Sequence, residues 1–505
     1  MSQSDNAPIL VGVGQQTWRD NNPNRTPTDA LEIAARAALD DAGSAQLASA
    51  IDALGMIRFI ADANPDTRGL FPRNPGAEVA QRLGLSSPEI YQATIGGNTP
   101  QYMVNHFAAK LQRGEHRAVL LSGAELLATM FGALGSGADI SAWPGEPAQE
   151  PPTIGQERDG LNATESAHGL FEPINTYPLF ENRLAHELGL SSTEHQQLIA
   201  ELSANMSAVA ASNPYAWRQD GMSAEQIGTV EKSNRYVGYP YTRVMNAVLA
   251  VDMAAAVVMT TVGQARELGI DPDRWVYLCG GADVNDVWYP SERQDLHRSP
   301  AVELAWQTIS QQTGVNIDAV DHFDIYSCFP SAVQVACREI GLDPLDARGV
   351  TVTGGLPFFG GPGNNYSLHA IAQMVERLRE RGGRGLVTAN GMYLTKHSMG
   401  LYAAEAPDTP FQPTDNAALQ AQIDAAPLVP LAQDPAGPAT VETYTVAFGR
   451  EGPKKGIVIA RNDAGERILA NTAEDPELLA QMVAENPIGK RGTVTVHEGK
   501  NLIQF

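Results

Sequence analysis

An order of predicted strands and helices occurs twice along the chain, and this repeat limits the fold more than any other feature. An apolar, β-branched run at residues 7–14 precedes a helix with Thr26 as its N-cap and Gly43 directly after its last turn. A second strand, helix and glycine follow at residues 274–314, and their spacing matches the first set. The repeat indicates an internal duplication of about 120 residues per copy.

Strands that alternate with helices predict parallel sheets whose faces are covered by helices. Two such copies, placed face to face, form a layered α/β/α/β/α body. The predicted fold class is therefore α/β, with a duplicated five-layered core. The last part of the chain departs from this pattern, because short β-rich runs there are separated by turns.

Composition shifts along the chain predict the domain boundaries. A glycine- and proline-rich excursion separates the copies, and a Pro/Ala/Asp/Gln-rich stretch follows the second copy. The predicted parts are an N-terminal half (1–125 and 246–270), an inserted loop domain (126–245), a C-terminal half (271–404), a linker (405–437) and an additional β-rich domain (438–505).

The charge balance excludes two classes of partner. The chain has 35 basic and 58 acidic residues, a net charge of −23, which disfavours nucleic acid and anionic membranes.

Three cysteines without CxxC spacing favour neither a disulfide framework nor a metal site, and a reducing cytoplasm is expected. The start of the chain predicts no signal peptide. The apolar stretch at residues 244–263 has Asp252 near its centre, so we predict a buried helix and strand there and no membrane span.

Two glycine-rich loops each precede a predicted helix, at residues 94–101 and 353–365. Neither has the spacing of a phosphate-binding loop or of a dinucleotide-binding fingerprint. One interpretation is that the glycines only permit tight crossings from strand to helix. The other is that the side-chain-free backbone lets a ligand approach closely.

Four motifs, in their order along the chain, favour the second interpretation. They are "SNPYA", "NAVLAVDMAAAVVM", "IYSCF" at residues 325–329 and "GGLPFFGGPGNN". Together they resemble the thiolase superfamily and its sterol-carrier-protein thiolase branch. The resemblance runs from about residue 7 to residue 403, and the added C-terminal part is most similar to that of type-1 thiolase-like proteins.

The resemblance implies an acyl-CoA ligand and a departure from the family's chemistry. Thiolases use a nucleophilic cysteine, an activating histidine and a second cysteine. In this sequence their positions fall on Gly97 or its neighbours, on Gly361, and on Asn390 or Gly391. Ordinary thiolysis and Claisen condensation are therefore not expected. The predicted substrate-binding residues are those of the two loops: Gly96, Gly97, Asn98, Gly354, Gly355, Gly360 and Gly361.

Other side chains could carry altered chemistry. The predicted catalytic residues are Tyr326, for proton transfer, Cys328, Asn390 and His397. Packing is the alternative for Cys328, and a structural role is the alternative for His397 and His369.

Three functions stay open on the sequence. They are an acyl-CoA-processing enzyme of acyltransferase descent, a C–C lyase that acts on 3-hydroxyacyl-CoA, and a non-catalytic acyl-CoA-binding protein. No cofactor is expected apart from a coenzyme A ester as substrate or ligand, and no metal. The expected oligomeric state is a monomer or a homodimer. Arg235 and Arg243 could meet the phosphates of coenzyme A or lie solvated on the surface.

Overall fold

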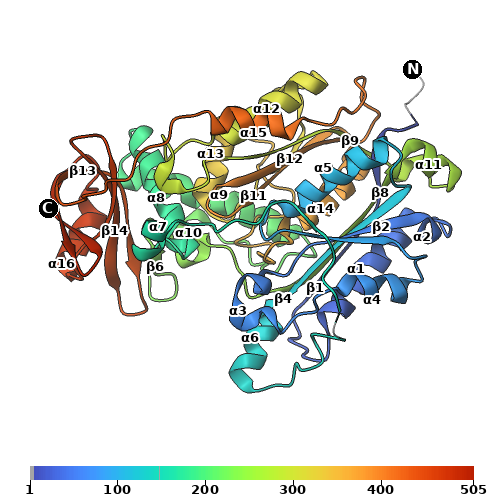
Figure 1. Ribbon diagram of the computed structural model, residues 1–505, viewed down its shortest axis with the longest axis horizontal. Coiled ribbons are helices and arrows are strands. Elements are labelled where there is room, and N and C mark those ends of the chain that lie inside the picture. The colour runs from blue at the N-terminus through green and yellow to red at the C-terminus, as the bar shows by residue number, and fades with distance from the viewer. Residues whose placement is uncertain (1–4, 147) are drawn as a thin grey trace.

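The computed structural model describes residues 5–146 and 148–505. Residues 1–4 of the predicted N-terminal half and residue 147 of the excursion lie outside the described residues. The expectation about a signal peptide rests partly on residues 1–4. Figure 1 shows an elongated molecule in which the β-rich C-terminal part lies at the opposite end from the N-terminus.

Ten strands form one mixed sheet that runs through both predicted halves, in the order β10-β11-β12-β9-β1-β8-β4-β2-β3-β5. In chain order its strands are β1 (Pro8–Trp18), β2 (Ile51–Met56), β3 (Glu89–Ala93), β4 (Ala118–Leu126), β5 (Thr153–Ile154), β8 (Asp252–Thr261), β9 (Val276–Asn285), β10 (His322–Asp324), β11 (Arg384–Gly391) and β12 (Lys396–Ala403).

The strand pairing confirms the duplication. In the first half β2 pairs parallel with β4, β4 pairs antiparallel with β8, and β8 pairs antiparallel with β1. The second half repeats these relations in β10, β11, β12 and β9. The halves join where β1 and β9 pair antiparallel, with Ile9 opposite Tyr277. The two copies therefore give the expected layered thiolase-like α/β core.

Helices form the layers on either side of each half of the sheet. The long helices of the repeat are α1 (Pro27–Ala42), α5 (Thr99–Gln112), α12 (Pro300–Thr313) and α14 (Tyr366–Arg381). Helix α1 packs on β1, β4 and β8, and α12 packs on β9 and β12. Helices α5 and α14 contact each other and strands of both halves, so they form the central layer (Figure 1).

Local signals in the sequence set the ends of these helices. Thr26 and Asp29 form a reciprocal capping box at the start of α1, and Gly43 ends the helix in the left-handed conformation. Shorter helices complete the two halves: α2 (Leu47–Ala50), α3 (Pro65–Arg68), α4 (Pro75–Leu83), α11 (Val262–Glu267) and α13 (Pro330–Ile340). Within residues 244–263, the fully buried strand β8 follows a 3-10 turn and an irregular segment, and α11 begins only at Val262, so the buried helix expected in this stretch is not found. A strand forms there because β1 and β4 pair with it on both sides. Within the described residues no helix is long and apolar enough to cross a membrane.

The inserted excursion is mainly helical. It contains α6 (Leu127–Ser136), α7 (Ala163–Ala167), α8 (Pro173–Glu187), α9 (Ser192–Ser212), α10 (Ala224–Gly228), β6 (Tyr236–Gly238) and β7 (Tyr241–Thr242). Its strand β5 pairs parallel with β3 and covers the outer strand of the first half. Helix α8 packs against α13 of the second half.

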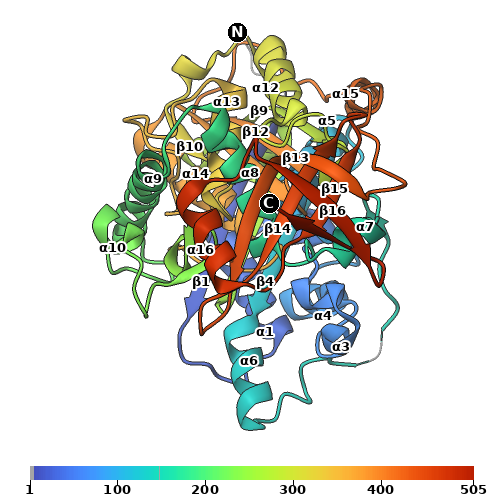
Figure 2. The same cartoon turned by 90° about the vertical axis from the view of Figure 1, so that its left-hand side faces the viewer.

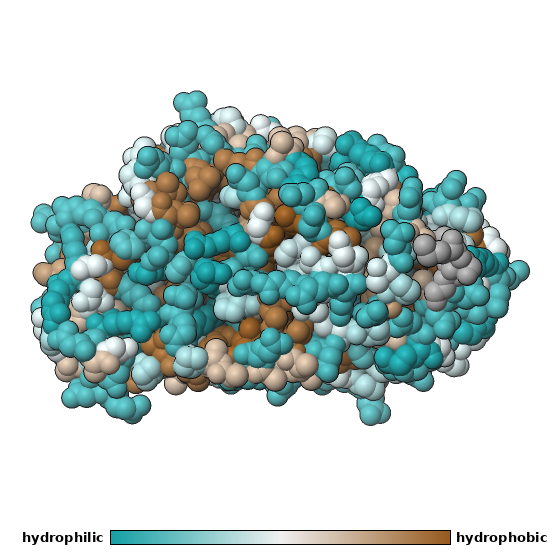
Figure 3. Space-filling model, turned by 90° about the horizontal axis from the view of Figure 1, so that it is seen from above, coloured by the Kyte–Doolittle hydropathy of each residue, from teal (hydrophilic) through white to brown (hydrophobic). Residues whose placement is uncertain are grey.

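The last part of the chain forms a second sheet beside the core (Figure 2). After α15 (Asn416–Asp424) come β13 (Gly437–Phe448), β14 (Pro453–Asn462), β15 (Arg467–Asn471), α16 (Pro476–Glu485), β16 (Arg491–His497) and β17 (Lys500–Gln504). Strands β6 and β7 of the excursion extend this sheet, so the two parts share one hydrogen-bonded unit. Seen from above, the surface is mostly hydrophilic with scattered hydrophobic patches (Figure 3), as expected for so acidic a chain.

Candidate functional site

The Gly96–Gly97 turn lies between β3 and α5, at the contact of the two halves. The second glycine loop holds it through side chains, because Asn364 Oδ1 accepts a hydrogen bond from the Gly96 N–H at 3.0 Å. Ser367, in the first turn of α14, donates its hydroxyl to the Gly97 carbonyl at 2.7 Å. The two predicted loops are thus brought together, and the turn is fixed from the opposite copy of the repeat.

The side chain of Tyr326 fills the space beside this turn. A Cβ atom built at Gly97 would overlap the Tyr326 hydroxyl oxygen and lie 2.6 Å from the main-chain oxygen of Asn390. Tyr326 is held by its backbone N–H, which donates to Thr388 Oγ1 at 2.9 Å, and by edge-on packing against Tyr366. Position 97 can therefore hold only glycine while Tyr326 keeps this place. Burial, assisted by the Cys328 sulfur, raises the pKa of Tyr326, so its phenol stays protonated at neutral pH.

Cys328 and Asn390 lie next to each other. The Asn390 amide nitrogen donates to the hydroxyl of Tyr177 at 2.9 Å and approaches the Cys328 sulfur at 3.8 Å. Tyr177 comes from α8 of the excursion and stacks on Phe329 with ring centroids 4.4 Å apart. Burial raises the pKa of the Cys328 thiol to about 12, so it is a neutral thiol at physiological pH.

Two amide oxygens in this region have no hydrogen-bond partner among residues 5–146 and 148–505. They are Asn390 Oδ1 and Asn98 Oδ1, and both residues are buried. The oxygen of Asn98 lies 2.7 Å from the place of a Cβ on Gly96 and 2.6 Å from that of a Cβ on Gly391. Buried acceptors are normally satisfied by protein or water, so these two oxygens are candidates to accept a hydrogen bond from a ligand or solvent.

The other predicted loop glycines face protein atoms. Cβ atoms built at Gly354 and Gly355 would lie 2.6 Å from Ala210 Cα and 2.7 Å from Met206 Sδ, both on α9. A Cβ atom built at Gly360 would lie 2.8 Å from Met253 Sδ. A Cβ atom built at Gly361 would lie 3.3 Å from Ala247 Cβ. These glycines allow close packing of the loop against α9 and the start of β8. Their predicted role in substrate binding stays a prediction.

The two predicted histidines hydrogen-bond to groups other than Tyr326, and His397 lies opposite Asn390 in the β11–β12 pair. His397 Nε2 is 3.2 Å from Asp286 Oδ2 and 3.4 Å from Ser299 Oγ, the N-cap residue of α12. His369 Nδ1 is 3.0 Å from Gln15 Oε1, and burial lowers the pKa of His369 to about 3. Because successive residues of a strand face opposite sides, His397 faces α12 while its neighbour Lys396 reaches the Gly96 turn.

Several groups at the site could not be assigned from the sequence. Tyr177 lies in the excursion, for which no motif predicts a site residue. Asn364 and Ser367 come after the glycines on which the prediction for the second loop is based. Lys396 directly precedes the predicted residue His397 and has no sequence signal of its own. A fully buried carboxyl, Glu125, accepts hydrogen bonds from the N–H groups of Ile60 and Asn364, and burial raises its pKa to about 8. No local sequence signal distinguishes these residues from ordinary polar positions.

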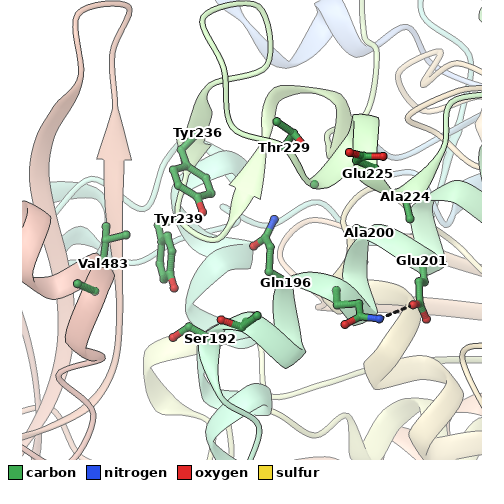
Figure 4. Close-up of a pocket in the computed structure, with 14 residues that line it drawn as sticks. Ser192, Gln196, Ala200, Glu201, Ala224, Glu225, Thr229, Tyr236, Tyr239 and Val483 are labelled. Atoms are coloured by element: carbon green, nitrogen blue, oxygen red, sulfur yellow. Dashed lines mark hydrogen bonds between the residues drawn. The ribbon is translucent and has the colours of Figure 1, made fainter.

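A groove of about 600 Å³ lies apart from this site, between α9, α10 and α16 (Figure 4). Tyr236 and Tyr239 face Gln196 across it, and Gln197 donates a hydrogen bond to Glu201 at 2.9 Å. None of the predicted site residues lines this groove. It marks the junction between the excursion and the additional C-terminal sheet.

Comparison with known proteins agrees with this architecture. The profile of the thiolase-like protein type 1 additional C-terminal domain matches residues 418–499. The crystal structure of a monomeric SCP2-thiolase-like protein type 1 from Mycobacterium smegmatis has a TM-score of 0.84 and 35% identity, and covers 100% of both chains. Acat5 thiolase from Ascaris suum, solved in complex with coenzyme A, has a TM-score of 0.55 and 15% identity over 79% of this chain and 99% of that one.

A curated relative aligns over part of the chain. A 3-ketoacyl-CoA thiolase from Klebsiella pneumoniae is 25% identical over 270 residues, which are 47% of this chain and 57% of that enzyme. The chain thus matches just over half the length of that relative. The sequence and the fold agree on the family.

Proposed function

Because this chain belongs to the SCP2-thiolase-like proteins of type 1, we propose that it binds a coenzyme A thioester at the Gly96–Gly97 turn and processes it without forming an acyl-enzyme. The thiolase superfamily supplies the expectation of an acyl-CoA ligand. The placement of Tyr326 against Gly97 supports the absence of covalent catalysis there, because no nucleophilic side chain fits at that position.

The groups around the turn favour hydrogen bonding over nucleophilic attack. With the pKa of Tyr326 raised and that of Cys328 raised to about 12, both side chains are protonated donors at neutral pH. A neutral phenol can donate to the carbonyl oxygen of a thioester and stabilise charge that develops there. The unpartnered oxygens of Asn98 and Asn390 can accept from amide N–H or hydroxyl groups of a ligand. The proposal therefore assigns Tyr326 to polarise the thioester and the two asparagines to position the ligand.

The proposed binding is tested by calorimetric titration of the protein with coenzyme A, acetyl-CoA and longer acyl-CoA esters. We expect saturable binding that weakens about ten-fold or more in Asn98→Ala, because a buried hydrogen bond to the ligand is lost. Tyr91→Phe, at an exposed tyrosine hydroxyl bonded to Glu89, serves as the control. Absence of binding to every ester would contradict the proposal.

A turnover screen separates the alternatives. If the protein is a C–C lyase, 3-hydroxyacyl-CoA esters release an aldehyde or ketone and Tyr326→Phe abolishes the release. The raised pKa of Tyr326 argues against this role, because a protonated phenol is a poor base. If the protein only binds acyl-CoA, no ester turns over, and substitutions at Tyr326, Cys328 or His397 change nothing but affinity.

The proposed oligomeric state is a monomer. Strand β5 of the excursion pairs with β3, so the outer strand of the first half already has a partner within the chain. Strand β3 covered in this way cannot itself pair with a strand of a second copy. Light scattering after size exclusion is expected to give the mass of one chain, and a dimer mass would contradict this assignment. A reducing compartment such as the cytoplasm suits the three free cysteines.

A further inference from the structure

Lys396 presents a buried ammonium group next to the Gly96 turn. Only 6% of the residue is exposed. Its Nζ donates to Thr94 Oγ1 at 3.1 Å and to the Ile95 carbonyl at 2.9 Å. An ammonium has three N–H donors, so one donor remains after these two contacts. Within the described parts of the chain Lys396 forms no ion pair, and both of its partners are neutral oxygens.

Two adjoining cavities open onto this ammonium. The larger has a volume of about 470 Å³ and the smaller about 280 Å³. Both are lined by Thr94, Gln156, Trp288 and Lys396, and we call the combined space the Lys396 chamber. A cavity of this size accommodates a small organic molecule.

The acidic groups around the chamber do not neutralise Lys396. Glu157, which lines the larger cavity, is ion-paired with Arg58 and mostly exposed. Asp159 lines the same cavity and is also exposed. In the smaller cavity Asp283 is held by the amides of Asn105 and Asn416, each at 3.0 Å, and burial raises its pKa to about 7.

The guanidinium group that lines the larger cavity, that of Arg158, already contacts aromatic rings. The guanidinium of Arg158 lies 5.1 Å from the ring centre of Trp288 and 4.8 Å from that of Tyr289. Burial lowers the pKa of Lys396 to about 8, although Glu157 opposes the shift, so most molecules still have the charged ammonium at pH 7. The Lys396 ammonium is thus a buried positive charge in the wall of the chamber. Among residues 5–146 and 148–505 it has no ion-pair partner.

We infer that the Lys396 chamber binds the carboxylate group of a small organic acid. A buried cation without a partner is unfavourable, and an anion that reaches it gains a charge-assisted hydrogen bond from the remaining N–H. A carboxylate fits better than a phosphate because only one ammonium is available and Glu157 and Asp159 stand beside the chamber. Both carboxylates would repel a dianion more strongly than a monoanion.

The inference goes beyond the proposed function and does not depend on it, since simple carboxylates should bind without coenzyme A. The two sites are nevertheless adjacent. Lys396 Nζ lies 3.1 Å from the place of a Cβ on Gly96, and Tyr326 lies beside Gly97.

Equilibrium dialysis with radiolabelled butyrate tests the inference. The unmodified protein and Lys232→Met, at an exposed lysine, should each bind one butyrate with the same affinity. Lys396→Met, which removes the charge and keeps much of the side-chain volume, should bind at least ten-fold more weakly. Inorganic phosphate should not displace butyrate. Equal binding in Lys396→Met, no binding to the unmodified protein, or displacement by phosphate would each overturn the inference.

A pH series on the unmodified protein tests the same inference if Lys396→Met does not fold. Butyrate affinity should fall about ten-fold for each pH unit above the pKa of about 8, because only the ammonium form binds the anion. Affinity that does not change between neutral and alkaline pH would overturn the inference.

Discussion

The hydroxyl oxygen of Tyr326 lies where the first side-chain atom of any residue other than glycine would stand at position 97. The two residues come from different copies of the repeat, since Gly97 precedes α5 and Tyr326 follows β10. A side chain from one half has therefore taken the space beside the turn of the other half. This relationship links the fold to the proposed absence of an acyl-enzyme.

The first prediction concerns this contact. Gly97→Ala should destabilise the protein by about 1–3 kcal/mol, because the new methyl group overlaps the Tyr326 hydroxyl in a closely packed region. In a Tyr326→Ala background the same substitution should cost less. Melting temperatures of the two single variants and the double variant measure this coupling. Gly132→Ala, on α6 with open space around it, is the control and should not lower the melting temperature.

Cys328 should react slowly with alkylating reagents. Burial raises its pKa to about 12, so only a very small fraction of the thiol is ionised at pH 7. The rate of iodoacetamide labelling at Cys328, followed by peptide mass spectrometry, should rise about ten-fold per pH unit between pH 7 and 9. A small thiol of ordinary pKa provides the reference rate. Labelling of Cys328 as fast as that reference at pH 7 would contradict the assignment of a neutral thiol.

Glu125 predicts a specific dependence of stability on pH. Burial raises its pKa in the folded protein from 4.5 to about 8, so the unfolded chain loses this proton at lower pH than the folded chain does. The contribution of Glu125 is therefore fully present below about pH 4.5 and is lost as the pH rises toward 8, by about 1.4 kcal/mol per unit. Glu125→Gln should remove this part of the pH dependence.

Melting temperatures of the unmodified protein and Glu125→Gln between pH 5 and 8 measure that contribution. The melting temperature of Glu125→Gln should rise relative to that of the unmodified protein as the pH increases. A difference that stays constant over this range would show that Glu125 is ionised in the folded protein.

The additional C-terminal sheet should depend on a buried charge pair. Arg467 is fully buried, donates to Glu442 at 2.6 Å and also donates to the carbonyls of Ser291 and Arg293 in the second half. Among residues 5–146 and 148–505, Arg467→Met leaves Glu442 with only the partly exposed Arg461 as an ionic partner, and it should cost about 3–5 kcal/mol. We expect faster proteolysis at residues 405–437 in this variant. Arg491→Met, at an exposed ion pair with Asp463, is the matched control.

Much of the fold could be predicted because the signals are local and repeated. The capping residues Thr26 and Gly43, together with the same order of elements in both copies, identify the core without long-range information. Strand β8 takes the place of the buried helix expected within residues 244–263, because the apolar run does not reveal that two strands pair with it. Strands β6 and β7 join the C-terminal sheet through hydrogen bonds between segments that are distant in the sequence. The composition of the segments does not predict such pairing.

The candidate site was only partly predictable for the same reason. Motif positions brought attention to Gly97, Tyr326, Cys328 and Asn390, and the structure places these four residues together. Lys396, on β12, contacts the Gly96 turn, and Tyr177, on α8, contacts Asn390. Both contacts join segments that are distant in the sequence. A sequence pattern does not contain that information.

No acyl-enzyme should form, because Tyr326 excludes a nucleophile at position 97 and Cys328 is a neutral thiol. The decisive experiment is intact-protein mass spectrometry after incubation with acetyl-CoA at a concentration that saturates binding. The mass of the unmodified chain is expected at every time point. An increase by one acetyl group, located at Cys328 by peptide mapping, would contradict it.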